Sequence, residues 1–250
     1  MKALTRAEVI KLATTRTFWL LAAGTLTLIV AAVTLDALAT TKADSTSPAR
    51  ATLALAGLAQ TVALIAGALA VTSEFRHKTI IPAVLITPRR GRLLAAKLIT
   101  LAGAGLAFGV AATGIAAAIT LPVLASRHVA SGIGGAQLTA IIAGGGAATA
   151  VCAALGVGAG AVIRNQVGAV VTVLSLLYVA VPLLALIPHV GPAVQQYGID
   201  GLVAAATGTT GFPATARLLG QASATAVLAG YAVAALLAGA TLLRRRDITG

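Results

Sequence analysis

The sequence has little charge, and acidic side chains are especially rare. Charged residues make up 10% of the 250 positions, and only six residues are Asp or Glu, whereas an ordinary soluble domain is about a quarter charged. Hydrophobic residues make up 58%, and the mean hydropathy is +0.98. Because so few charges cannot cover the surface of a soluble domain of this length, the composition predicts an integral membrane protein.

Cysteine, aromatic residues and histidine are also scarce. The single cysteine, Cys152, excludes an intrachain disulfide, and its apolar neighbours predict a small buried side chain. Aromatic residues are 3% of the chain, too few to provide base-stacking groups among the basic residues. The net charge of +12 therefore does not indicate a nucleic-acid partner. The three histidines, His77, His128 and His189, are not at metal-ligand spacing, so no metal site is expected.

No motif of an enzyme or a nucleotide-binding protein is present. The chain lacks the Gly-x-x-x-x-Gly-Lys-Ser/Thr loop that holds phosphates, a His-Glu-x-x-His pair and a Gly-x-Ser-x-Gly turn. We therefore expect no catalytic residue and no cofactor in this chain. Asp36 is the only acid within a long apolar run and lies near its outer end, whereas proton-driven pumps place ionisable groups at mid-depth. Energy for any transport would come from another subunit.

What the sequence does contain is a series of long apolar runs. A membrane-spanning helix needs about 20 mostly apolar residues, because a helix satisfies its own backbone hydrogen bonds within hydrocarbon. Six segments meet this requirement and predict one all-α, polytopic transmembrane domain over residues 1–250, with a bend at Pro182 in the fifth span. The six segments are Phe18–Ala39, Leu53–Thr72, Leu98–Leu124, Leu138–Ile163, Val167–Ile187 and Ala222–Leu243.

Glycines inside these spans favour close packing between helices. Two pairs stand four residues apart, Gly105/Gly109 and Gly156/Gly160. The glycine content alone predicts about three such pairs by chance, so the spacing that marks helix dimers carries no information here. No dimer interface is assigned from it.

The distribution of basic residues predicts the orientation. With the N-terminus inside, fourteen of the eighteen Lys and Arg residues fall in inner segments. Lys and Arg concentrate in short cytoplasmic loops of membrane proteins, so both termini are expected to be cytoplasmic, in the cell membrane. Ala37-Leu38-Ala39 is also similar to a signal-peptide cleavage site, although the preceding apolar run is longer than is usual. Cleavage would leave the later helices in the same orientation, and the intact mass would reveal it.

The inner segment 73–97 is long and polar. Thr87-Pro88 has the chemistry of a helix start, because Thr can cap a helix and Pro is tolerated at its first position. One interpretation is an ordinary basic loop held at anionic lipid headgroups. In that case Glu74 would form a local, exposed ion pair with Arg76 or Lys78, which contributes little to stability. The other interpretation is a docking surface for a partner.

The order of residues in this segment resembles the cytoplasmic loop of ABC-2 type transporter permeases, most closely the short, Ala-rich actinobacterial type. Two further segments are similar: the basic residues before the first span and the Arg-rich C-terminus. Many members have Gly where Lys78 stands, which leaves the local turn open. The matching stretches are Glu74-Phe75-Arg76-His77-Lys78-Thr79, Thr87-Pro88-Arg89-Arg90, Leu94-Ala95-Ala96-Lys97, the positions Glu8, Lys11, Arg16 and Trp19, and Arg244-Arg245-Arg246-Asp247.

The resemblance implies a function for these segments. Residues Glu74, Phe75, Arg76, His77, Lys78, Thr79, Pro88, Arg89 and Arg90 would form the coupling region that docks on a separate ABC ATP-binding subunit. Glu8, Lys11, Arg16 and Trp19 would belong to an N-terminal helix at the membrane surface. A second permease copy, identical or related, would help to enclose the pathway. The chain would then export a small amphipathic or lipid-like compound; the alternative is a membrane anchor or interaction protein without transport. An intramembrane enzyme is disfavoured because no catalytic constellation is visible.

The outer segment 189–221 is long as well. It contains a short apolar run, Ile199–Ala206, bracketed by glycines and prolines. The run is too short to span a membrane and suits a re-entrant or interfacial helix, which related permeases also carry between their last two spans. The alternative is a loop that floats in water.

Overall fold

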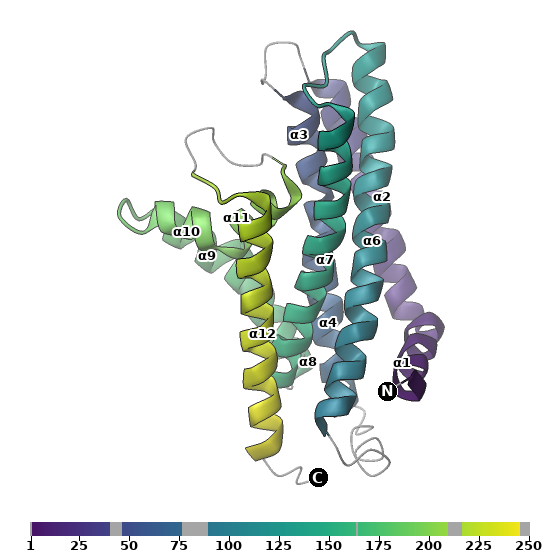
Figure 1. The fold of residues 1–250 in the computed structure, drawn as a ribbon, viewed down its shortest axis with the longest axis vertical. Coiled ribbons are helices and arrows are strands. Elements are labelled where there is room, and N and C mark those ends of the chain that lie inside the picture. Colours follow the sequence, from purple (N-terminus) through teal and green to yellow (C-terminus); the bar gives the residue numbers. More distant parts are fainter. Residues whose placement is uncertain (1, 41–46, 77–89, 164, 210–216, 246–250) are drawn as a thin grey trace.

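The computed structural model describes residues 2–40, 47–76, 90–163, 165–209 and 217–245, and within these ranges every regular element is helical (Figure 1). The predicted all-α class is confirmed. The helices are α1 (Lys2–Thr14), α2 (Arg16–Ala39), α3 (Pro48–Leu53), the 3-10 helix η1 (Ala54–Gly57), α4 (Leu58–Arg76), α6 (Arg90–Ser126), α7 (Gly135–Ile163), α8 (Gln166–Ser175), the π-helix η2 (Leu176–Ala180), α9 (Val181–Ala185), α10 (Gly191–Tyr197), α11 (Ile199–Thr207) and α12 (Gln221–Arg245).

Six of the described helical segments are long and apolar enough to cross a membrane, which confirms the predicted number. They are α2, the continuous run from α3 to α4, α6, α7, the run from α8 to α9, and α12. The fifth is irregular where a bend was expected, because a π-helical turn, η2, directly precedes the Pro182 region. The start of α1 and the end of α12 lie toward the same end of the bundle (Figure 1), as an even number of membrane crossings would require. We call this the terminal end and the opposite one the far end.

Helix α7 is the centre of the bundle and packs against α4, α6 and α12. Its buried side is made of small residues, so neighbouring backbones approach closely. A Cβ atom placed on Gly156 would lie 2.0 Å from the carbonyl oxygen of Leu64, and one on Gly109 would lie 2.5 Å from that of Gly145. The Gly105/Gly109 and Gly156/Gly160 pairs thus pack within the chain, on the α6–α7 and α4–α7 contacts respectively.

Helix α2 packs at the edge of the bundle through one narrow face. Ile29 and Val33 are fully buried, in contact with residues of α3, α4 and α6. Leu20, Leu28 and Leu35, by contrast, are more than half exposed. Exposed leucines on a helix of this length are what a lipid-facing surface requires.

Helix α11, which lies between α9 and α12 in the chain, is packed on the bundle. Helix α11 contacts α7 and α12, and Leu202 and Ala206 are fully buried. The turn from α10 into α11 is tight, since a Cβ atom on Gly201 would lie 1.7 Å from the carbonyl oxygen of Gln195. Helix α11 ends at Gly208, whose positive φ of 69° caps the helix in the left-handed conformation. The apolar run Ile199–Ala206 is therefore part of a packed helix and not of a loop that floats in water.

Candidate functional site

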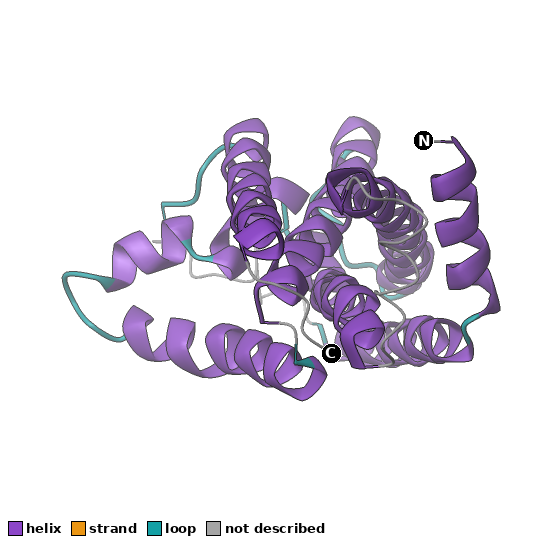
Figure 2. Ribbon diagram, turned by 90° about the horizontal axis from the view of Figure 1, so that it is seen from below, coloured by secondary structure: helices purple, strands orange, loops and turns teal. Residues whose placement is uncertain are grey.

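Four charged side chains from three helices meet near the terminal end of the bundle. Glu8 and Lys11 come from α1, Glu74 from the last turns of α4, and Lys97 from the first third of α6. Helix α1 lies at the edge of the bundle when it is seen from below (Figure 2), so its charged residues can reach inward to α4 and α6. We call these four residues the charged junction.

The charged junction is a continuous network of ion pairs. Lys97 Nζ lies 2.8 Å from Glu8 Oε2 and 3.0 Å from Glu74 Oε1. Lys11 Nζ also forms an ion pair with Glu74 Oε1. The side chains of Lys97 and Glu74 are 3% and 7% exposed, while that of Lys11 is 48% exposed. The network therefore runs from the surface at α1 into the interior at α4 and α6.

The four charges sum to zero, and this balance is what allows them to be buried. Removing an ion from water costs several kcal/mol, and a close partner of opposite charge offsets that cost. Lys97 has two carboxylates in contact, and Glu74 has two ammonium groups. Loss of any one of these side chains would leave a buried charge uncompensated.

The structure corrects one expectation about Glu74. One interpretation of the sequence was an exposed local pair of Glu74 with Arg76 or Lys78. Glu74 is instead buried and forms ion pairs with Lys11 and Lys97, and Lys78 lies outside the described residues. Arg76 points elsewhere: its Nη1 donates to Gln166 Oε1 over 3.0 Å, which connects the end of α4 with the start of α8. The reason is that α4 continues as a helix through Arg76, so residues two apart face different directions.

The other predicted site residues are distributed around the charged junction. Phe75 packs with the buried apolar cluster that includes Val71 and Leu101. Arg16 begins α2, and Trp19 Nε1 donates to the carbonyl oxygen of Ala13 over 2.9 Å, across the break between α1 and α2. Arg90 begins α6. His77, Lys78, Thr79, Pro88 and Arg89 lie outside the described residues.

A cavity of about 530 Å³ lies beside the charged junction. Its charged wall is formed by Glu8, Lys11, Arg76 and Lys97, and its apolar wall includes Phe18 and Leu101.

Sequence analysis placed Lys97 at the end of a stretch that matches the permease loop, but it did not identify a partner for this side chain. Its contacts to Glu8 and Glu74 span 89 and 23 residues of chain, a separation at which no spacing rule applies.

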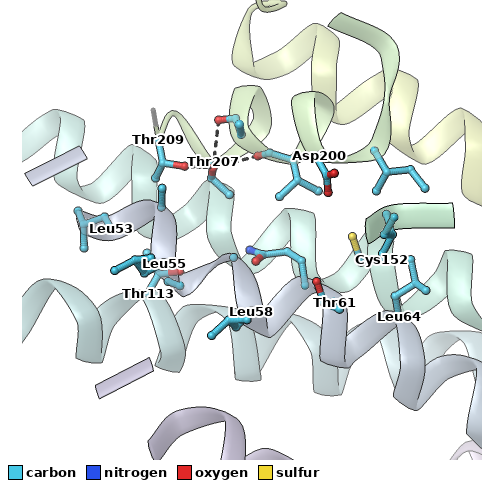
Figure 3. A pocket seen from close by; sticks show the side chains of 18 of the residues that line it. Leu53, Leu55, Leu58, Thr61, Leu64, Thr113, Cys152, Asp200, Thr207 and Thr209 are labelled. Atoms are coloured by element: carbon cyan, nitrogen blue, oxygen red, sulfur yellow. Dashed lines mark hydrogen bonds between the residues drawn. The ribbon is translucent and has the colours of Figure 1, made fainter. Parts of the chain in front are cut away.

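A second cavity, of about 340 Å³, lies between α11 and the α3–α4 segment (Figure 3). We call it the outer cavity, because it belongs to the half of the bundle away from the termini (Figure 1). Sequence analysis did not predict this cavity, because its walls come from five separate segments of the chain.

Among the described residues, no group of three or more His, Cys, Asp or Glu side chains could hold a metal ion.

Comparison with known proteins adds no relative: no protein-family model and no curated protein sequence match this chain.

Proposed function

We propose that this chain is the membrane-spanning permease subunit of an ATP-binding cassette transporter in the cell membrane. A separate subunit hydrolyses ATP, and the permease exports a small amphipathic or lipid-like compound. Six spanning helices support a pathway through the bilayer. A second copy of the chain, or a related one, completes the pathway.

The charged junction is the observation that carries this proposal. Residues 77–89 connect α4 to α6, and the resemblance to ABC-2 permeases assigns docking of the ATP-binding subunit to this segment. A force applied to the segment acts on the ends of both helices. Because Glu74 and Lys97 join α4 to α6, and Glu8 and Lys11 join both to α1, the three helices move as one unit.

In this mechanism Glu74 is a positioning residue. Its carboxylate is buried within the protein. Glu74 therefore transmits motion between helices and does not itself contact the ATP-binding subunit. Docking of the ATP-binding subunit falls to the segment 77–89, as the resemblance implies.

The experiment co-expresses the tagged chain with the ABC ATP-binding subunits of its own genome. An ATP-binding subunit should co-purify with the chain, and its rate of ATP hydrolysis should change on assembly. Glu74→Gln keeps the shape of the side chain and removes its charge. We expect this variant to insert and to bind the subunit, while the effect of assembly on hydrolysis falls about tenfold, a typical size for a coupling energy between two sites.

Arg92→Gln is the matched control, because Arg92 is a charged residue near the same end of α6 but is exposed. If the inner charges only hold the loop at lipid headgroups, Arg92→Gln should impair function and Glu74→Gln should be silent. Failure of every ATP-binding subunit to co-purify with the wild-type chain would reject the permease function and leave a membrane anchor.

A further inference from the structure

The outer cavity is bordered by several helices and has mainly apolar walls. It lies between the α3–η1–α4 segment and α11 (Figure 3). Leu177 and Tyr178 of η2 also line it. The volume of about 340 Å³ lies within the range of small-molecule sites, which is roughly 300–1,000 Å³. The apolar lining includes four leucines of the α3–α4 segment, Leu53, Leu55, Leu58 and Leu64.

Most hydroxyl groups along the outer cavity already have hydrogen-bond partners. Thr61 Oγ1 and Tyr178 Oη lie 3.2 Å apart and connect α4 with η2. Thr207 Oγ1 donates to a backbone carbonyl of α11 and lies 2.7 Å from Thr209 Oγ1. These groups shape the cavity and can contribute weak polar contacts to a ligand.

Asp200 is different. Its side chain is exposed and points into the space between α11 and α4 (Figure 3). Within the described parts of the chain no ion pair to Asp200 is formed, and none of the described residues that line the outer cavity is basic. The cavity therefore presents one negative charge among apolar walls.

A helix start offers a simpler explanation for an acid at this position. Asp200 lies in the first turn of α11, where a carboxylate stabilises a helix by roughly 0.3–1 kcal/mol. That effect accounts for an acid near the start of α11, but it does not require the carboxylate to line a cavity without a basic partner. A cation in the cavity would complete the charge balance, and an anion would be repelled.

We propose that the outer cavity binds a monocationic amphipathic molecule, an organic ammonium or phosphonium with an apolar body, and that the Asp200 carboxylate is its counter-ion. The apolar body lies against the leucines of the α3–α4 segment, and the cationic centre lies beside α11. The inference rests on the proposed function, because it names the class of compound that the permease would transport.

The test measures binding to the purified chain in lipid nanodiscs without any ATP-binding subunit. The probes are radiolabelled tetraphenylphosphonium and tetraphenylborate, two ions of the same shape and opposite charge, and empty nanodiscs supply the background. We expect saturable binding of the phosphonium alone. Asp200→Asn should weaken that binding about tenfold, the equivalent of roughly 1.4 kcal/mol, while Asp200→Glu should retain most of it.

Asp36→Asn is the matched control. Asp36 is an acid of the same predicted membrane side, but it accepts a hydrogen bond from Thr52 and does not line the outer cavity. Equal saturable binding of both ions by the wild-type chain, or no saturable phosphonium binding, would overturn the inference without any variant. Unchanged binding of the phosphonium to the Asp200→Asn variant would also overturn the inference. If the chain binds the phosphonium but no ATP-binding subunit co-purifies with it, the transport function is rejected and the cation site stands.

Discussion

Lys97 is the cation on which both carboxylates of the charged junction depend. Its Nζ atom is within hydrogen-bond distance of Glu8 and Glu74, and the side chain is almost completely buried. Lys11, the other cation, is half exposed and its charge is accordingly better screened by solvent. The interior of the junction is therefore most sensitive to the loss of Lys97.

We expect Lys97→Met to lower the free energy of unfolding by about 3–5 kcal/mol, because removal of one partner leaves buried charge uncompensated. Methionine keeps the length and the apolar part of the side chain, so the change isolates the charge. The measurement is the thermal unfolding midpoint of the purified protein in detergent.

Two variants serve as controls for this prediction. The double variant Glu74→Leu/Lys97→Met removes both buried charges and should recover much of the loss, since well-packed apolar residues often replace a buried ion pair at no cost. It leaves Glu8 and Lys11, which are three residues apart and can pair along α1. Arg92→Gln, at an exposed position, should stay within about 0.5 kcal/mol of wild type. A Lys97→Met protein as stable as wild type would contradict the role of the junction.

At the scale of elements, the small residues of α7 decide how closely the helices pack. The wall of α7 toward α4 is formed by Gly156 and Gly160, whose added Cβ atoms would meet backbone atoms of Leu64 and Ala68. A backbone atom cannot rotate away as a side chain can. Close approach between membrane helices gains van der Waals contact, and small residues are what permit it.

Two glycine substitutions should therefore change stability in opposite directions. In Gly156→Ala the new methyl group would lie 2.0 Å from the Leu64 carbonyl oxygen, which forces α7 away from α4 and costs roughly 1–3 kcal/mol. In Gly114→Ala, on α6, the new methyl group meets nothing within 4 Å. Alanine is favoured over glycine inside a helix by roughly 0.5–1 kcal/mol, so this variant should be slightly more stable.

Thermal unfolding of both variants under identical detergent conditions measures the difference. Gly114→Ala controls for the general effect of replacing glycine in a membrane helix. If Gly156→Ala unfolds at the same temperature as Gly114→Ala, the α4–α7 contact is looser than described.

At the scale of the whole molecule, the described residues form six helical segments that are long and apolar enough to cross a membrane. The start of α1 and the end of α12 lie toward the same end of the bundle (Figure 1), and the distribution of basic residues along the sequence predicts that this end faces the cytoplasm. The orientation of the chain in the membrane can be tested by asking which residues a reagent outside the cell can reach.

We expect an impermeant thiol reagent to label intact cells only at the far end. With Cys152 replaced by Ala, single cysteines are placed at Ser47, Thr87 and Gly250. Ser47 should react, because it follows the first span, whereas Thr87 and Gly250 should react only after the cells are permeabilised. Labelling of Gly250 in intact cells would reject the six-span topology.

The number of spans is a property that the sequence determines by itself. Crossing a bilayer requires a certain length of apolar helix, and a helix satisfies its backbone hydrogen bonds locally. Each span can therefore be recognised without knowledge of the others. The sequence also showed the short apolar run Ile199–Ala206, but it left open whether this run packs on the bundle or lies in a loop exposed to water.

The contacts between helices were decided only by the tertiary structure. Lipid and protein interior are both apolar, so hydrophobicity does not reveal which face of a membrane helix is buried: on α2, Ile29 is buried while the equally apolar Leu28 is exposed. Without that information the partners of Glu74, which lie 63 and 23 residues away, could not be identified. For the same reason Asp200 has no visible relation to a cavity in the sequence, because the cavity exists only once α11 has packed over α4.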